Sequence, residues 1–156
     1  MGDRSAILPQ IRKALEEGGE RAGRFRRIAE IIREGAGYRW VGLYEVAGEE
    51  IALVAWSGPS EPAHARFPVS EGLCGEAVRR RATIVVGDVR LDERYLETLG
   101  STRSEIVVPI LNVVTGRARG LLDVESDHVD AFTAEDRTLL ERCASELARE
   151  VSPSPG

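Results

Sequence analysis

The sequence has few of the residues that build metal sites and disulfides. It contains two cysteines, Cys74 and Cys143, and two histidines, His64 and His128. The cysteines lie far apart and form no CxxC pair, and neither histidine has a second ligand at metal-binding spacing. These shortages argue against a metal site, a bound cofactor and a structural disulfide.

Long apolar runs and basic clusters are also scarce. No segment approaches the roughly 20 apolar residues that a membrane span needs, and residues 1–7 do not resemble a signal peptide. Residues 79–81 (RRR) form the only run of three consecutive basic residues in a chain of net charge −5, and no aromatic residues are interleaved with it. We therefore expect a cytoplasmic protein that binds neither membranes nor nucleic acid.

What the chain does contain is typical of one globular domain. Its 156 residues are 42% apolar and 30% charged, a balance that suits a single buried core. No linker divides the sequence, so we expect one domain over residues 1–156. Proline and serine are concentrated in residues 152–156, which predicts a disordered tail.

Helices are predicted at both ends of the chain. Apolar residues recur at helical spacing in residues 7–15 and 25–32, which predicts a helical N-terminus over about residues 5–34. Gly35 is expected to end the second of these helical stretches. The last helix is expected to begin at Thr133, a candidate N-cap with Asp136 at the third helical position.

Strands are predicted between these helices. Residues 38–46 and 50–56 are rich in β-branched and aromatic residues on either side of a turn, and residues 105–112 and 118–125 repeat that pattern. The sequence between the two hairpins predicts, in order, a long loop at 57–71 with a short strand at 66–69, a helix at 72–81, a buried strand at 83–86, and a helical or irregular crossover at 91–99. This order favours an antiparallel sheet with helices on one face, which leaves the other face free for a pocket.

The acidic residues of the second hairpin form the most informative pattern. Alternation along residues 120–126 (GLLDVES) sends Leu121, Asp123 and Glu125 to one face. On the partner strand, Glu105 precedes an apolar run. Three carboxylates are therefore expected to converge, although a solvated strand face would explain such acids equally simply.

Aromatic residues are expected on the same face. Trp40, Gly42 and Tyr44 alternate along the first strand, so two rings flank a residue without a side chain. Rings and carboxylates both attract an ammonium group, which suggests a small cationic or zwitterionic ligand. Ordinary core packing is the alternative for the two rings.

Cys74 lies in residues 71–77 (EGLCGEA), a glycine-bracketed turn that leads into a helix. A thiol near a helix N-terminus can have a lowered pKa, because the backbone dipole favours the thiolate. The alternative is a buried, inert cysteine. Cys143 falls on the apolar stripe of the last helix and is expected in the core.

Four motifs together resemble those of free methionine-(R)-sulfoxide reductases. They are WVGLY at residues 40–44, GLCG at 72–75, SEIVVP at 104–109 and GLLDVES at 120–126. The similarity runs from about residue 28 to residue 147. It implies a GAF domain of the α/β (α+β) class, with a central antiparallel sheet of five to six strands, the N- and C-terminal helices packed on one face, and a ligand cavity on the other.

The resemblance also implies roles for particular residues. The positions that hold substrate in this family match Trp40, Tyr44, Glu105, Asp123 and Glu125, where glutamate replaces the usual aspartate at position 125. The nucleophilic cysteine of the family falls at Thr98, and a second family cysteine falls at His64. Cys74 is the one family cysteine that remains.

Three hypotheses follow from this pattern. The favoured one is a GAF module that binds an amino-acid-like ligand without turnover, because a threonine hydroxyl has no redox cycle that could reduce a sulfoxide. The second is a reductase that uses Cys74 with thioredoxin or another external thiol. The third is a regulatory domain without a ligand, which forms a homodimer through its terminal helices.

Overall fold

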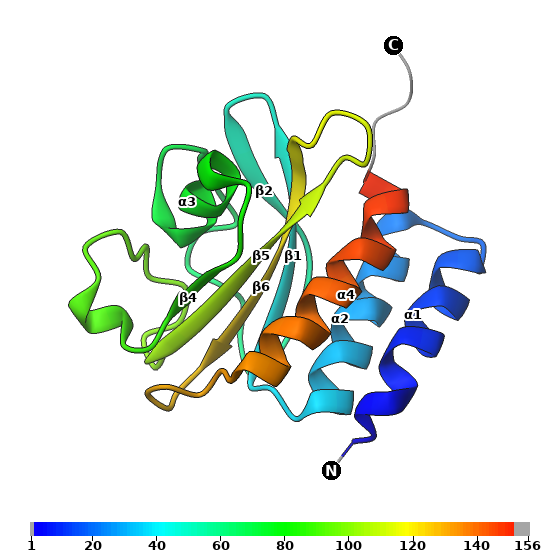
Figure 1. The fold of residues 1–156 in the computed structure, drawn as a ribbon, viewed down its shortest axis with the longest axis horizontal. Helices are drawn as coiled ribbons and strands as arrows, with labels where there is room; N and C mark the ends of the chain where they lie inside the picture. Colours follow the sequence, from blue (N-terminus) through cyan, green and yellow to red (C-terminus); the bar gives the residue numbers. More distant parts are fainter. Residues whose placement is uncertain (1, 152–156) are drawn as a thin grey trace.

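An antiparallel sheet organises the fold, as the sequence pattern predicts (Figure 1). The computed structural model describes residues 2–151. Within them the sheet has six strands in the order β3-β2-β1-β6-β5-β4. The strands are β1 (Trp40–Ala47), β2 (Glu50–Ser57), β3 (Arg66–Pro68), β4 (Ile84–Val86), β5 (Ser104–Leu111) and β6 (Ala118–Ser126). Both predicted hairpins, β1–β2 and β5–β6, are confirmed.

Among the described residues, two helices pack directly on one face of the sheet, a third packs on those two, and a fourth lies on the other face (Figure 1). The helices are α1 (Ile7–Glu16), α2 (Arg21–Ala36), α3 (Gly72–Arg80) and α4 (Ala134–Val151). The N- and C-terminal helices α1, α2 and α4 share a face, as predicted, and α3 lies across the sheet from them. The predicted tail at residues 152–156 lies outside the described residues.

Side-chain alternation in the strands divides the apolar residues into two cores. The larger core joins the terminal helices to the sheet and includes Phe25, Leu122 and Cys143. The smaller core lies under α3 and includes Trp40 and Cys74. The expectation that Cys143 is a core residue is confirmed, and the sheet separates it from Cys74.

Two segments between the hairpins can be compared with the sequence prediction, and the first differs from it in detail. The strand predicted as buried, β4, is an edge strand in which Val85 is 44% exposed, because only the face that carries Ile84 and Val86 is packed in the core under α3. The crossover at residues 91–99, predicted as helical or irregular, is irregular and follows a short 3-10 turn (Val89–Leu91).

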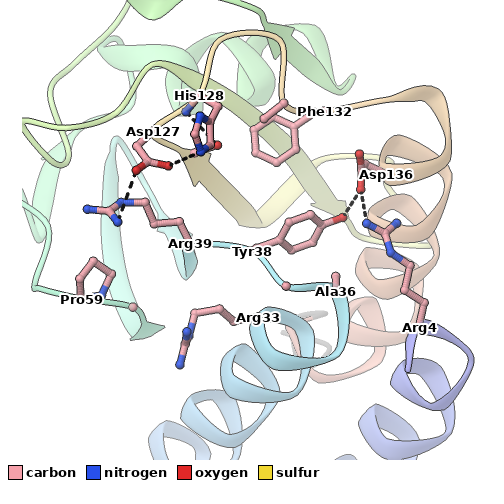
Figure 2. Close-up of a pocket in the computed structure, with 14 residues that line it drawn as sticks. Arg4, Arg33, Ala36, Tyr38, Arg39, Pro59, Asp127, His128, Phe132 and Asp136 are labelled. Atoms are coloured by element: carbon pink, nitrogen blue, oxygen red, sulfur yellow. Dashed lines mark hydrogen bonds and ion pairs between the residues drawn. The ribbon is translucent and has the colours of Figure 1, made fainter. Parts of the chain in front are cut away.

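Asp136 ties the start of α4 to the segment before α1 and to the segment after α2. Its carboxylate accepts hydrogen bonds from the Thr133 backbone at 2.8 Å, the Tyr38 hydroxyl at 2.7 Å and the Arg4 guanidinium at 2.8 Å (Figure 2). The Asp136 N–H donates to Thr133 Oγ1, which completes the predicted cap. Burial opposes ionisation of Asp136, but these hydrogen bonds outweigh it and lower the pKa of the carboxyl.

Asp136→Ala is expected to lower the free energy of unfolding by about 2–4 kcal/mol at pH 7, because it removes a helix cap and charged hydrogen bonds together. The lowered pKa means that this contribution is present above the unfolded-state pKa of about 4 and is lost as the pH falls through the folded-state value. Urea unfolding at pH 7 and pH 3 measures both effects. The matched control is Glu135→Ala, an exposed neighbour whose loss is expected to change stability by less than about 0.5 kcal/mol.

Candidate functional site

Three acidic side chains lie side by side on the sheet face that carries α3. Glu105 on β5 pairs directly with Glu125 on β6, and Asp123 lies two residues earlier on β6. Directly paired residues, and residues two apart on one strand, project to the same face of a sheet. The structure therefore brings together the three acids that the sequence singles out.

These carboxyls are buried rather than solvated. Glu105 is 3% exposed, and Asp123 and Glu125 are each 1% exposed. Thr102 Oγ1 donates a hydrogen bond of 2.7 Å to Glu125 Oε1, whereas Asp123 Oδ1 and Glu125 Oε2 have no hydrogen-bond partner within residues 2–151. The interpretation of a merely solvated strand face is therefore wrong.

Burial and mutual repulsion change how the three groups ionise. Burial raises the pKa of Glu105, Asp123 and Glu125 well above the usual carboxyl range, and the charge of a neighbouring carboxylate raises each pKa further. The trio consequently retains protons at a pH where isolated carboxyls have lost theirs. A cation placed among them would release those protons and offset the burial of charge.

Trp40 and Tyr44 form the aromatic side of the site. Trp40, Gly42 and Tyr44 alternate on β1, and the indole folds over the glycine so closely that a Cβ there would overlap the ring. Trp40 Nε1 donates to the Ser60 carbonyl at 3.1 Å, and the Tyr44 ring meets Phe67 edge-on with 5.8 Å between centroids. Trp40 is thus held by the loop that follows β2, and Tyr44 packs against β3.

A small cavity of about 20 Å³ lies beside the acids. Its lining includes Tyr44, His64, Cys74, Thr98, Glu105 and Asp123. Trp40 and Glu125 lie next to these residues but do not line the cavity. One water needs roughly 10–15 Å³, so the space admits a water or an ion, and a larger ligand requires the walls to move.

Two irregular loops supply part of these walls. His64 belongs to the loop between β2 and β3, and Thr98 belongs to the crossover between β4 and β5. The Ala63 N–H donates to the Thr98 carbonyl at 2.8 Å, which joins the two loops over the cavity.

Cys74 lies in the first turn of α3 and lines the cavity, but it is buried. Burial raises the pKa of its thiol well above the usual value, and the nearby carboxylates raise it further. The sequence-based idea that the helix N-terminus lowers this pKa is therefore wrong, because desolvation and negative neighbours outweigh the backbone dipole. Cys143 lies on the far side of the sheet and cannot act as a resolving thiol for Cys74.

Two residues that support the site have no signal in the sequence. Thr102 anchors Glu125, and Ser60 anchors Trp40, yet both lie in loops far along the chain from their partners. Strand alternation predicted the positions of Glu125 and Trp40 but gave no information about their loop partners. A loop residue with a long-range hydrogen bond is not predicted by any local period.

A second pocket, of about 640 Å³, opens at the end of the sheet near the start of α4 (Figure 2). Several of its charged groups already have partners: Arg39 pairs with Asp127, and Arg4 pairs with Asp136. It shares no residue with the acidic cavity. The buried carboxyls therefore remain the stronger candidate site.

Comparison with known proteins agrees with this architecture. The family model for GAF domains matches residues 20–151. The chain belongs to the GAF domain family. None of the helices of this GAF domain within residues 2–151 is both long and apolar enough to cross a membrane.

Relatives of this GAF domain include reductases. It is 30% identical over 135 residues to GAF domain-containing protein A of Dictyostelium discoideum, covering 86% of this chain and 83% of that one. It is 31% identical over 110 residues to free methionine-R-sulfoxide reductase of Escherichia coli, covering 70% of this chain but only 64% of the reductase. The crystal structure of the Neisseria meningitidis free methionine-R-sulfoxide reductase in complex with its substrate superposes with a TM-score of 0.84, at 33% identity, covering 96% and 89% of the two chains.

Proposed function

We propose that this GAF domain binds a small amino-acid-like ligand through its ammonium group and does not reduce it. The observation that carries the proposal is the buried, unpartnered oxygen Asp123 Oδ1 beside the cavity. Buried polar atoms normally have a partner, and an unpartnered carboxylate oxygen suits a ligand that donates. An ammonium group offers three donors and a positive charge to this oxygen and its acidic neighbours.

The aromatic side chains support the same ligand class. Tyr44 lines the cavity and Trp40 packs beside it, so a bound ammonium would lie between rings and carboxyls. The relationship to reductases of free methionine-(R)-sulfoxide points to methionine and its sulfoxides as the first ligands to test.

The absence of turnover follows from the thiols. Position 98, which matches the nucleophile of the reductases, is threonine, and the remaining Cys74 is buried with a raised pKa. Reduction of a sulfoxide needs a thiolate that attacks the sulfur and a second thiol that regenerates it. With Cys143 across the sheet, this chain lacks that pair.

Calorimetric titration tests the binding proposal. Methionine and free methionine-(R)-sulfoxide are expected to bind, and N-acetylmethionine, which has no ammonium group, is not. Asp123→Asn is expected to weaken binding about 10- to 100-fold, the cost of one charged hydrogen bond. Asp127→Asn, just beyond the end of β6 and outside the cavity, is the matched control and should bind as the unchanged chain does.

Two results would overturn the proposal. If no amino acid tested gave a binding signal, the proposed ligand class would be wrong. If N-acetylmethionine bound as tightly as methionine, the ammonium group would have no role in binding. Consumption of methionine-(R)-sulfoxide that disappears in Cys74→Ser would instead support a reductase that works with an external thiol.

A further inference from the structure

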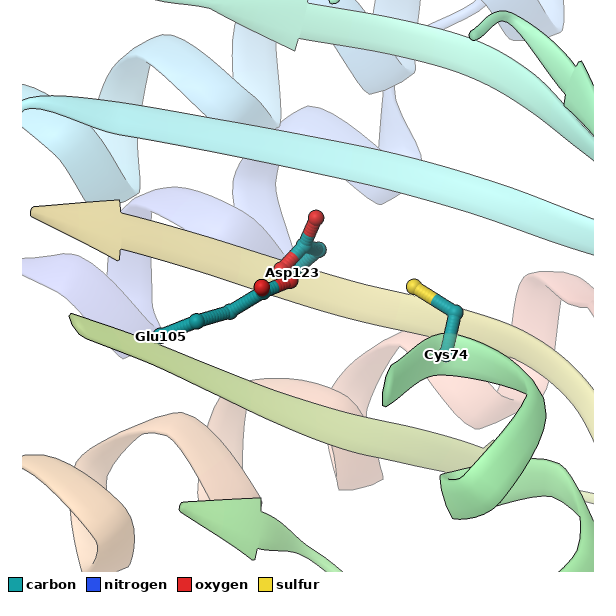
Figure 3. A group of neighbouring side chains, drawn as sticks. All are labelled: Cys74, Glu105 and Asp123. Carbon is teal, nitrogen blue, oxygen red and sulfur yellow. The ribbon is translucent and has the colours of Figure 1, made fainter. Parts of the chain in front are cut away.

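Cys74, Glu105 and Asp123 form a compact group of ligand atoms at the cavity. The cysteine sulfur and one carboxylate oxygen from each acid all lie within 4.8 Å of one another (Figure 3). The three residues come from α3, β5 and β6, so no spacing rule along the sequence would detect them. The sequence-based expectation of no metal site considered only such spacings.

A second observation points to a bound cation at this place. Asp123 Oδ1 is buried and has no hydrogen-bond partner among the described residues, and Asp123 lines the cavity. The cavity volume of about 20 Å³ accommodates an ion without any movement of the loops, whereas an amino acid requires them to open.

We propose that Cys74, Glu105 and Asp123 bind a divalent transition-metal ion of the zinc type. Zinc lies about 2.3 Å from sulfur and about 2.0–2.2 Å from carboxylate oxygen, so tetrahedral ligands around it are roughly 3.3–3.7 Å apart. The three atoms reach that spacing by closing in by about an ångström. A thiolate among the ligands favours zinc over magnesium or calcium, which prefer oxygen alone.

Three protein ligands leave one position of the tetrahedron open. Water can fill it, and so can the imidazole of His64, which lines the same cavity. The metal and the ammonium ligand would both use Asp123 Oδ1, so their binding is mutually exclusive. The metal proposal goes beyond the proposed function and does not depend on it.

Cobalt(II) provides the most direct test, because a cobalt–thiolate bond gives an absorption band in the near ultraviolet. The whole chain, reduced and freed of metal with a chelator that is then removed, is titrated with Co²⁺ and then with Zn²⁺ in the absence of amino acids. We expect one equivalent of Co²⁺ to produce the thiolate band and one equivalent of Zn²⁺ to abolish it. Mg²⁺ at the same concentration is expected to have no effect.

The variants assign the band to the site. Cys74→Ser is expected to lose the absorption band and to weaken Zn²⁺ binding about 100-fold or more. Mutation of a residue that only supports a metal ligand already lowers metal affinity about 10- to 100-fold. Cys143→Ser, on the other side of the sheet, is the matched control and should keep both. Asp123→Asn is expected to weaken Zn²⁺ binding as strongly, and it provides the test if Cys74→Ser does not fold.

Three outcomes would overturn the metal site: no stoichiometric binding, a band that survives in Cys74→Ser, or a band that disappears in Cys143→Ser. Because the amino-acid titrations are run with a chelator present and the metal titrations without amino acid, failure of one proposal leaves the other standing.

Discussion

Replacing Thr98 with cysteine is expected to give this chain the single-turnover chemistry that it lacks. The residue lines the cavity beside Cys74, Glu105 and Asp123. A thiolate there would attack the sulfoxide sulfur of a ligand held by the carboxyls. The oxygen would pass to the cysteine as a sulfenic acid, and methionine would leave reduced. We expect one methionine per chain from Thr98→Cys and only background from the unchanged chain.

Repeated turnover needs a second thiol, and position 64 is a suitable place to introduce it. His64 and Thr98 line the same cavity from loops joined by the Ala63–Thr98 hydrogen bond. In the double variant His64→Cys/Thr98→Cys, the new thiol is expected to condense with the sulfenic acid, releasing water and forming a disulfide. An external dithiol then reduces that disulfide and restores the thiols. Cys74 lines the same cavity, but burial and the nearby carboxylates raise the pKa of its thiol and make it a poor partner for the sulfenic acid. The double variant should therefore turn over many times where Thr98→Cys stops after one.

Chromatographic measurement of methionine, with mass spectrometry of the protein, follows both steps. Thr98→Ser is the matched control, because it retains an oxygen nucleophile and should remain at background. Turnover by the unchanged chain at the rate of the double variant would contradict this account and assign the chemistry to Cys74.

The strands and their facing residues could be predicted because they depend on local periods. Alternation along residues 120–126 placed Asp123 and Glu125 on one face, and pairing with β5 then brought Glu105 beside them. The cap at Thr133 was equally visible, since the N-cap and third helical residues form a local pattern. Each of these features needs only a few neighbouring residues to specify it.

The pKa of Cys74 and the volume of the cavity could not be predicted in the same way, because both depend on the residues that pack over the site. Position in the first turn of α3 allowed either a reactive Cys74 or a buried, inert one. The structure shows a buried Cys74, and the surrounding core and the carboxylates of β5 and β6 raise its pKa. The volume of the cavity depends on how the loops that carry His64 and Thr98 meet, and no period in the sequence records that contact.

The buried acids also predict an unusual effect on stability: Asp123→Asn is expected to make the protein more stable at pH 8. Asparagine has nearly the same shape, is neutral without having to bind a proton, and can donate an amide hydrogen bond to Glu105 or Glu125. Replacing buried charged groups by neutral ones often stabilises a protein, so we expect a gain of about 1–3 kcal/mol in the free energy of unfolding. The same variant is expected to lose the ligand and the metal.

The pH dependence separates this effect from ordinary improvement of packing. The pKa of Asp123 is raised in the folded protein, so the folded state holds a proton that the unfolded state has released above a pH of about 4. Stability therefore falls as the pH rises from that value toward the folded-state pKa, by at most about 1.4 kcal/mol per pH unit for each retained proton. Asp123→Asn removes one such proton, so the free energy of unfolding should depend less steeply on pH.

Urea unfolding of both proteins from pH 5 to pH 8 measures the slope directly. The difference between them should be smallest near pH 5 and grow toward pH 8, opposite in sign to the loss expected for Asp136→Ala. Asp127→Asn, a partly exposed carboxyl paired with Arg39, should change neither the stability nor the slope by more than about 0.5 kcal/mol. If Asp123→Asn instead destabilised the protein equally at every pH, the buried acids would stabilise the fold. Their burial would then no longer be explained by a binding site that lowers stability.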